Sequence, residues 1–178
     1  IVGGGTLGSG VSSLLSSPHI STTSVDVYDS IFVDLLADAH DLPFQNKQFD
    51  GVWVQAVLEH VIDPARVSSE ITRVLKTKGI LYSEIPFMQD VHEGAYDFTR
   101  FTLTGHRNLF RSFKVLASGS VDEGHTQISW ALRSYIRTIP ILSSLATVAF
   151  YGFAMLLRPL AIFQKKRRIL DSASSTFL

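Results

Sequence analysis

The sequence predicts an α/β fold built around a doubly wound, mostly parallel sheet. Three observations predict it: a glycine-rich turn at residues 3–10, a capped amphipathic helix that begins near Asp63, and short apolar runs that alternate with helical patterns. Strands that alternate with helices imply right-handed crossovers, and therefore neighbouring strands that run parallel. An apolar helical tail is expected to follow this unit.

The first predicted elements surround the glycine turn. Ile1 and Val2 are expected to end a first strand, and the turn is expected to lead into a helix at residues 11–17. Further strands are predicted at 25–27, 31–36 and 50–54. The run at 50–54 is apolar enough for the middle of a parallel sheet.

The helix after Asp63 is the best-specified element. Asp63 can cap it, and Pro64 suits its first helical position. Its apolar side chains recur at helical spacing, and Gly79 is expected to end it. The charged side chains on its other faces, expected to lie in solvent, are Arg66, Glu70, Arg73 and Lys76. The elements expected after it are a strand at 80–85, a helix at 103–110 and a strand at 113–117.

The composition excludes several classes of protein. The 178 residues include 16 basic and 16 acidic side chains, and this zero net charge argues against a general nucleic-acid partner. The chain has no cysteine, so disulfides and cysteine-bound metals are excluded. A cytoplasmic location is compatible with this composition. Because little of the first strand precedes the glycine turn, we infer an N-terminal truncation.

A composition shift divides the chain into a predicted α/β domain at 1–130 and an apolar, basic tail at 131–178. No charged residue occurs from Ile139 to Leu157, and a basic cluster follows at 165–168. This run approaches the roughly 20 residues that span a bilayer. The alternatives are packing on the sheet, peripheral membrane contact through 139–168, a dimerisation surface and true spanning. The end, Asp171 to Leu178, is expected to be frayed, and the sequence leaves the oligomeric state open.

The glycine turn indicates a nucleotide-like ligand. Gly3, Gly5 and Gly8 fit the pattern G-x-G-x-x-G, which permits positive φ angles and a close approach of the backbone to a ligand. Asp26 follows about twenty residues later, where a carboxylate can accept hydrogen bonds from ribose hydroxyls. The turn alone fits a nicotinamide-dependent oxidoreductase equally well.

A second signal separates these alternatives. Asp38-Ala39, Leu42-Pro43-Phe44 and Phe49-Asp50 follow in an order that resembles class I S-adenosylmethionine (SAM) dependent methyltransferases of the type 11 branch. The resemblance covers about residues 1–118 and includes Leu58-Glu59-His60 and the segment 96–102. It implies the Rossmann-like class I fold, SAM as cofactor and methyl transfer to a small-molecule acceptor. A lipid-linked or glycan-related acceptor is the expectation if the apolar tail meets a membrane.

The resemblance also implies roles for single residues. Gly3, Gly5 and Gly8 would pass beneath the methionine and ribose of SAM, Asp26 would hold the ribose hydroxyls, Asp38 and Ala39 would meet the adenine, and Gln55 would face the methionyl end. One departure is Ile1, which stands where the family usually has an acid for the methionine amino group. A degenerate methyltransferase-like module that binds without turnover is therefore an alternative, beside the oxidoreductase.

Substrate residues are expected in the segment 86–102, because binding residues of this fold lie in loops after the strands. We hypothesise that His92 or Asp97 assists deprotonation of the acceptor, and that Tyr96 or Arg100 places it. The alternative is that Tyr96, Asp97 and Arg100 form an internal hydrogen-bonded clamp. His60 is expected to be structural or to line the floor of the site. No pair of histidines or acids has metal-ligand spacing, so no metal is predicted.

Overall fold

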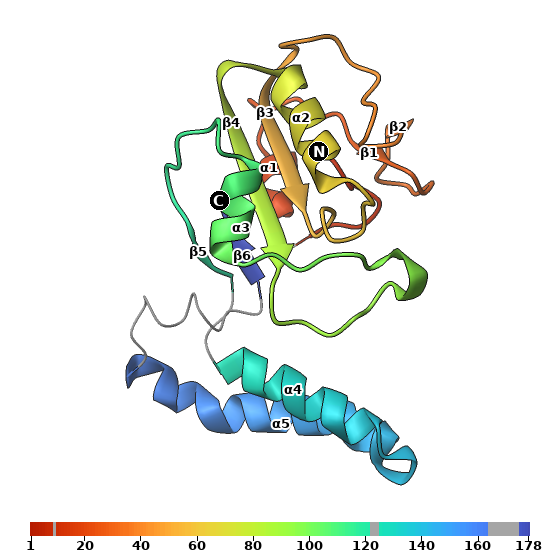
Figure 1. The fold of residues 1–178 in the computed structure, drawn as a ribbon, viewed down its shortest axis with the longest axis vertical. Helices are drawn as coiled ribbons and strands as arrows, with labels where there is room; N and C mark the ends of the chain where they lie inside the picture. The colour runs from red at the N-terminus through yellow and green to blue at the C-terminus, as the bar shows by residue number, and fades with distance from the viewer. Residues whose placement is uncertain (9, 122–124, 164–174) are drawn as a thin grey trace.

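The computed structural model describes residues 1–8, 10–121, 125–163 and 175–178 (Figure 1). Its α-helices are α1 (Val11–Leu15), α2 (Pro64–Val74), α3 (Leu103–Leu109), α4 (His125–Arg137) and α5 (Ala146–Leu157). Its strands are β1 (Val25–Asp26), β2 (Leu35–Leu36), β3 (Phe49–Gln55), β4 (Leu75–Pro86), β5 (Gly119–Ser120) and β6 (Ser175–Phe177). The 3-10 helices are η1 (Gly94–Tyr96), η2 (Pro140–Leu145) and η3 (Arg158–Phe163).

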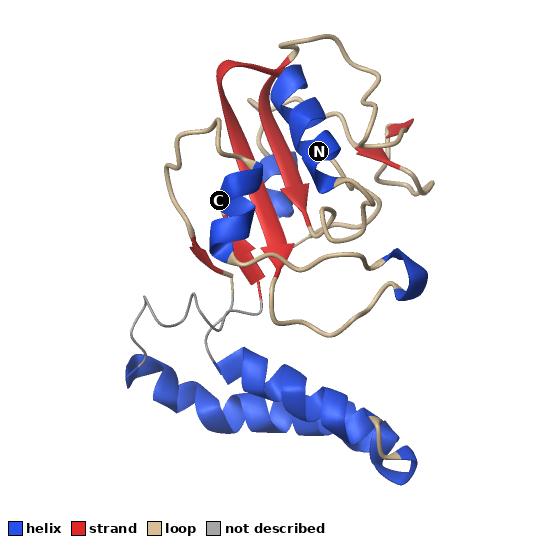
Figure 2. Cartoon of the chain, viewed as in Figure 1, coloured by secondary structure: helices blue, strands red, loops and turns tan. Residues whose placement is uncertain are grey.

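The strands form a mixed, mostly parallel arrangement that confirms the predicted α/β class. Val2 makes parallel bridges to Val25 and to Val54, so the start of the chain lies between β1 and β3. The order across the described strands is β2, β1, the Val2 segment, β3, β4, β6 and β5. Among the described strands, β6 is the one that runs opposite to the others, because it pairs antiparallel with both β4 and β5. The carboxyl ends of β1, β3 and β4 therefore meet at one edge (Figure 2).

The core lies between the central strands and α2. Val54 on β3 is fully buried, as are Val67 and Ile71 on α2. The side chain of Asp63 accepts a hydrogen bond from the Arg66 backbone N–H, which confirms the predicted cap. Figure 1 shows α2 and α3 over one face of the sheet and α1 behind it. Burial of this apolar stripe fixes α2 against the strands that carry the loops described below.

The predicted end of α2 at Gly79 is wrong. The helix ends at Val74, and the chain turns directly into β4 because Leu75 adopts an extended conformation. The pairing register then shifts between Phe49 and Gly51, so residues after Leu75 bulge out of the ladder. Gly79 sits in this bulge, where a Cβ would lie 2.9 Å from the Lys76 carbonyl oxygen. Gly79 is thus required by the bulge in β4, and it does not end the helix.

The predicted strand at 113–117 is also wrong, and the final strand was not predicted. The chain pairs at Gly119–Ser120 instead, and it does so with β6, from the segment expected to be frayed. The backbone N–H and carbonyl groups of Ser83 and Leu178 bond each other reciprocally, at 3.1 and 2.8 Å. A Cβ on Gly119 would lie 2.7 Å from the Phe177 ring, so the glycine lets that ring pack closely. The predicted tail therefore ends in a strand of the sheet.

Helices α4 and α5 lie side by side between β5 and β6 in the sequence (Figure 1). Trp130 and Phe150 pack with ring centroids 5.0 Å apart, and the Arg133 guanidinium lies 5.0 Å from the Trp130 ring centroid. The basic cluster at 165–168 lies outside the described residues. Among the described helices, none has the length and apolar character that a membrane span requires.

His106 is a buried polar group in the α3–β4 contact. Its side chain is fully buried, and its Nε2 lies 2.7 Å from the Ser83 hydroxyl oxygen. Burial lowers the pKa of His106 from its ordinary value near 6.5 to about 4, because a charged imidazolium would lose its hydration. The folded state therefore keeps this ring neutral at pH values where the unfolded chain protonates it.

We expect acid to destabilise the fold through His106. The unfolded chain binds the extra proton below about pH 6.5 and the folded chain only near pH 4, so the stability present above pH 6.5 falls as the pH drops through this window. The predicted loss is roughly 3 kcal/mol of unfolding free energy. Urea titrations of the parent and of His106→Gln between pH 4 and 7 measure it as the difference between their pH dependences, because the buried Glu59, whose pKa is raised to about 7, changes the stability of both in the opposite direction. His106→Gln should lack the His106 contribution, whereas His19→Gln, at an exposed histidine, should leave the parental slope. An unchanged slope in His106→Gln would refute the assignment.

Candidate functional site: a cavity at the carboxyl edge of the sheet

A cavity of about 970 Å³ opens where β1, β3 and β4 end. Its volume is at the upper end of the range for small-molecule sites. The glycine turn forms one wall, and the segment after β4 closes the other side. All of the predicted cofactor residues line it, namely Gly3, Gly5, Gly8, Asp26, Asp38, Ala39 and Gln55.

The glycine turn runs so close to its neighbours that side chains would not fit. A Cβ on Gly3, whose φ is +76°, would lie 2.0 Å from Val57 Cγ2. A Cβ on Gly8 would lie 2.1 Å from Gln55 Oε1. The bare backbone of the turn therefore lines one wall of the cavity, where a ligand can approach it closely.

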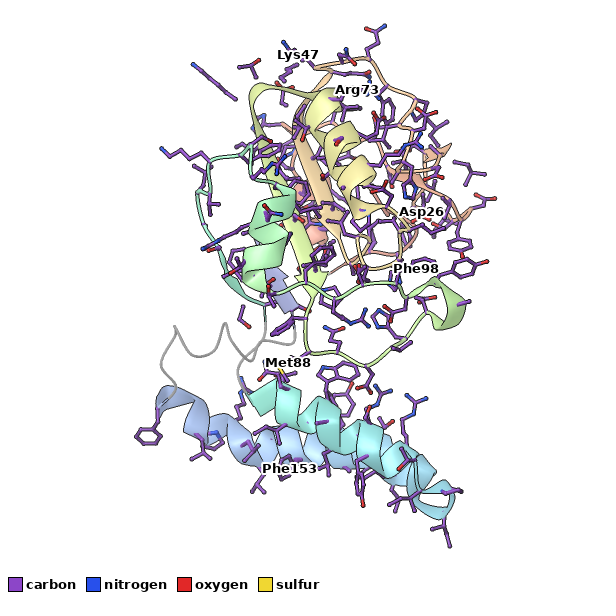
Figure 3. All side chains as sticks on the ribbon, viewed as in Figure 1. Asp26, Lys47, Arg73, Met88, Phe98 and Phe153 are labelled. Carbon is purple, nitrogen blue, oxygen red and sulfur yellow. The ribbon has the colours of Figure 1, made fainter. Side chains whose placement is uncertain are left out.

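Asp26 ends β1 and anchors this turn. Its Oδ2 accepts a hydrogen bond from the Gly5 backbone N–H at 2.8 Å, and its Oδ1 accepts one from the Tyr28 N–H at 3.0 Å. A carboxylate has about four acceptor positions, so capacity remains for hydroxyl groups of a ligand in the cavity. Asp26 and Phe98, which both line the cavity, are labelled in Figure 3.

Asp38 lies on the opposite wall and is paired with His40. The carboxylate accepts from the His40 backbone N–H at 2.8 Å and from its Nδ1 at 2.6 Å, and these bonds hold the pKa of Asp38 below its usual range. Nε2 of His40 in turn accepts from the Asp63 N–H at 3.2 Å. His40 thus ties the Asp38 loop to the start of α2. The side chain of Asp38 stays 63% exposed, so it is open to a ligand.

A polar network supports Gln55 at the end of β3. Its Oε1 accepts from the Trp53 indole N–H at 3.2 Å, and its Nε2 donates to Glu84 Oε2 at 2.9 Å. Glu84 Oε2 also accepts from the Tyr82 hydroxyl at 2.9 Å, and burial together with this carboxylate raises the pKa of Tyr82. The sequence analysis missed Glu84, which lines the cavity from the next strand.

The four residues that were predicted for deprotonation and for placing the acceptor, all in the segment after β4, fall into two pairs. His92 and Tyr96 line the cavity, whereas Asp97 and Arg100 do not. The Arg100 guanidinium binds both oxygens of Asp97 and also donates to the Asp90 carbonyl at 2.9 Å. Asp97 is 1% exposed, and the bonds from Arg100 lower its pKa to about 2. This geometry is that of the internal clamp, although the clamp does not include the Tyr96 side chain.

Comparisons with known proteins bear on this cavity. The family description "Methyltransferase domain", of the type 11 branch, matches residues 10–83. A glycine/sarcosine/dimethylglycine N-methyltransferase of Actinopolyspora halophila is 46% identical over 50 residues, which are 28% of this chain and 9% of that protein. The matched family segment begins at Gly10, just after Gly8, and runs through the Asp38 loop and β3 into β4.

Residues 10–83 match the methyltransferase domain family of the type 11 branch.

Solved structures agree on the fold of this methyltransferase domain. The [4+2]-cyclase SpnF superposes with a TM-score of 0.58 at 19% identity, over 99% of this chain and 72% of that chain. The PH0226 protein of Pyrococcus horikoshii gives a TM-score of 0.54 at 19% identity, over 68% of this chain and 74% of that one. The fold is that of class I SAM-dependent methyltransferases, whose cofactor is SAM. The chain matches less than a tenth of its curated relative's length.

Two charged residues of α2 hold the loop of the methyltransferase domain that follows Asp38. Glu70 Oε2 accepts from the Leu42 backbone N–H at 2.8 Å, and the Arg73 guanidinium donates to the carbonyls of Leu42 and Phe44 at 2.8 and 2.7 Å. Arg73 also binds Glu70 itself, at 2.7 Å, and lowers its pKa. The expectation that both face solvent is wrong, because the loop folds back over them. Their i, i+3 spacing was the available signal.

Glu59, just after β3, is the most unusual acid of the domain. Its side chain is fully buried, and neither carboxylate oxygen has a hydrogen-bond partner among the described residues. Burial raises its pKa to about 7. The His60 ring lies next to it and lines the cavity, as one of the two predicted alternatives for His60 requires.

We expect Arg73→Met to weaken SAM binding by about tenfold, because the Leu42–Phe44 turn would lose the donors that position the Asp38 loop. Calorimetric titration with SAM measures the loss. Lys76→Met is the matched control: Lys76 pairs only with the exposed Asp50 at 2.8 Å, and such pairs contribute little. Equal affinity in the parent and Arg73→Met would contradict this role of Arg73.

Proposed function

We propose that this chain transfers the methyl group of SAM to a small-molecule acceptor that enters beside His92 and Tyr96. The observation that carries the proposal is the cavity that Asp26 and the Asp38 loop, both within the segment that matches the methyltransferase family, share with the glycine turn that precedes this segment. In this proposal Asp26 holds the ribose hydroxyls, Asp38 and Ala39 contact the adenine, and the glycine turn and Gln55 border the methionine.

The proposed reaction asks little covalent chemistry of the protein. Methyl transfer from a sulfonium needs the acceptor atom held in line with the methyl group, in a pocket that excludes competing orientations. Gln55 and Glu84 line this pocket from the ends of β3 and β4, and His92 and Tyr96 line it from the segment after β4. In the proposal His92 assists deprotonation and Tyr96 positions the acceptor, while Asp97 and Arg100 act by holding the segment that carries them.

The proposal also includes a lipid-linked or glycan-related acceptor and membrane contact through residues 139–168. The loop after β4 shares a shallow surface with α4, at Asp90, Val91 and Arg137, so α4 lies beside the loop that carries His92. The exposed apolar side chains of η2, α5 and η3 include Ile141, Val148, Tyr151, Met155, Leu156 and Phe163. Such a surface supports peripheral contact with lipid and a lipid-linked or glycan-related acceptor, in a cytoplasmic setting. Flotation with acidic vesicles tests the contact, and absence of co-flotation would remove it.

Calorimetric titration of the 178-residue chain with SAM and with NAD tests the proposed cofactor. We expect SAM to bind at one site per chain and NAD not to bind. Gly8→Ala should weaken SAM binding by about tenfold or more, because the new Cβ would meet Gln55 Oε1 at 2.1 Å and displace this amide from Trp53 and Glu84.

The control is Gly152→Ala in α5, where a Cβ would meet no atom within 4 Å and binding should match the parent. Binding of NAD instead of SAM would support the oxidoreductase. A folded chain that binds neither would contradict the proposal and favour a module without turnover.

A further inference from the structure

Three side chains that could ligate a metal converge beside the cavity, and two of them line it. They are Glu59 and His60 after β3, and His92 from the segment after β4. One ligand atom of each lies within 4.8 Å of the other two. His92 follows His60 by 32 residues, so the sequence spacing does not reveal this cluster.

The carboxylate of Glu59 lacks the partner that its burial demands. The side chain is 0% exposed, and both oxygens are without a hydrogen bond among the described residues. The Nε2 atom of His60 lies 3.6 Å from Oε1, which is beyond hydrogen-bond distance. A buried, unpartnered carboxylate is costly, and such groups in native proteins are paired or coordinate a metal.

The two imidazoles are oriented as metal ligands usually are. Nδ1 of His60 lies 2.7 Å from the Tyr96 carbonyl oxygen, and Nδ1 of His92 lies 3.0 Å from the Asp90 carbonyl oxygen. A carbonyl oxygen can only accept, so the contact of His60 requires its Nδ1 to carry the proton, and the contact of His92 with Asp90, which is shorter than the 3.5 Å from the same Nδ1 to the Arg100 guanidinium, favours the same tautomer. In this tautomer each Nε2 keeps a lone pair. A backbone carbonyl on the second ring nitrogen is the usual support of a histidine ligand.

We propose that Glu59, His60 and His92 bind one divalent metal ion of the zinc class on the acceptor side of the cavity. Two imidazoles and one carboxylate suit Zn²⁺ and its first-row neighbours, whereas Mg²⁺ and Ca²⁺ prefer oxygen ligands alone. Three protein ligands leave a fourth position open, as in catalytic zinc sites. Both histidines line the cavity, so this position faces it.

The cluster must tighten when the ion binds. Bonds of about 2.1 Å in a tetrahedral site place ligand atoms about 3.4 Å apart, closer than the 4.8 Å limit of the cluster. His92 can supply this movement, because its side chain is 40% exposed and lies in a loop. Glu59 and His60 are already held by the later part of the same loop, where the Phe98 N–H donates to the Glu59 backbone carbonyl at 2.8 Å and the Tyr96 carbonyl oxygen lies 2.7 Å from His60 Nδ1.

This inference rests on the proposed function and narrows its acceptor to a hydroxyl compound. A hydroxyl bound at the open position loses its proton to water more readily, because the ion stabilises the alkoxide. The oxygen then forms a bond to the methyl carbon, and the electron pair of the carbon–sulfur bond returns to sulfur, which leaves S-adenosylhomocysteine. If His92 is a metal ligand, it does not act as the base named under the proposed function. The ligand role predicts methyl transfer that requires the metal ion, whereas the base role predicts methyl transfer that does not.

Zinc titration of the metal-free 178-residue chain, against a chromophoric chelator and without SAM, tests the site. We expect one ion per chain, and we expect His60→Ala and His92→Ala each to weaken binding at least about tenfold. Co²⁺ in place of Zn²⁺ should give a visible absorption spectrum that the same variants abolish. His19→Ala, at an exposed histidine outside the cluster, should bind as the parent does.

Absence of a stoichiometric ion, or binding that both histidine variants leave unchanged, would overturn the site and mark any bound zinc as adventitious. Glu59→Gln should weaken binding as well; if it fails to fold, the two histidine variants decide the question. The calorimetric titration with SAM separates the two proposals. SAM binding without zinc overturns the metal site alone, and zinc binding without SAM overturns the proposed function alone.

Discussion

The close passage of the glycine turn beneath the ends of β1 and β3 is the constraint on which the rest of the site depends. The backbone at Gly3 and Gly8 lies where a Cβ would overlap Val57 and Gln55. Two parallel bridges of Val2 fix the chain that enters the turn, and the Asp26 carboxylate fixes its centre. The cavity exists because this backbone is held without side chains, and the acids that line it are placed by the same strands.

The second wall depends on charged groups rather than on sheet pairing. Glu70 and Arg73 use one face of α2 to bind the backbone of the Leu42–Phe44 turn. His40 joins the same loop to the helix cap at Asp63. These bonds are partly buried and geometrically defined, so they position the loop far better than an exposed ion pair would. The cavity therefore combines a rigid floor with a wall that α2 orients.

Local patterns were sufficient to predict the parts of the fold that local physics determines. The glycine turn, the Asp63 cap and the apolar run of β3 all lie where the sequence placed them. The fold class and the cofactor followed from the order of these signals and from the resemblance. In contrast, β6 pairs across more than fifty residues with β5, and nothing in the sequence near Ser175 encodes that partner.

The functional side chains show the same division. Asp26 and Asp38 line the cavity because they lie at or just after the ends of strands, and a sequence pattern can locate strand ends. The ion pair of Asp97 with Arg100, the support of the loop by Arg73, and the convergence of Glu59 with His92 depend on how distant loops fold together. Residue type and spacing suggested chemistry at these positions, but only tertiary contacts separate a clamp from a ligand set.

A crystal structure of the chain with S-adenosylhomocysteine tests the central claim most directly. The account predicts ribose hydroxyls within hydrogen-bond distance of the Asp26 carboxylate, the adenine beside Asp38 and Ala39, and the sulfur near Gln55. S-adenosylhomocysteine bound outside this cavity, or with its adenine away from the Asp38 loop, would contradict it.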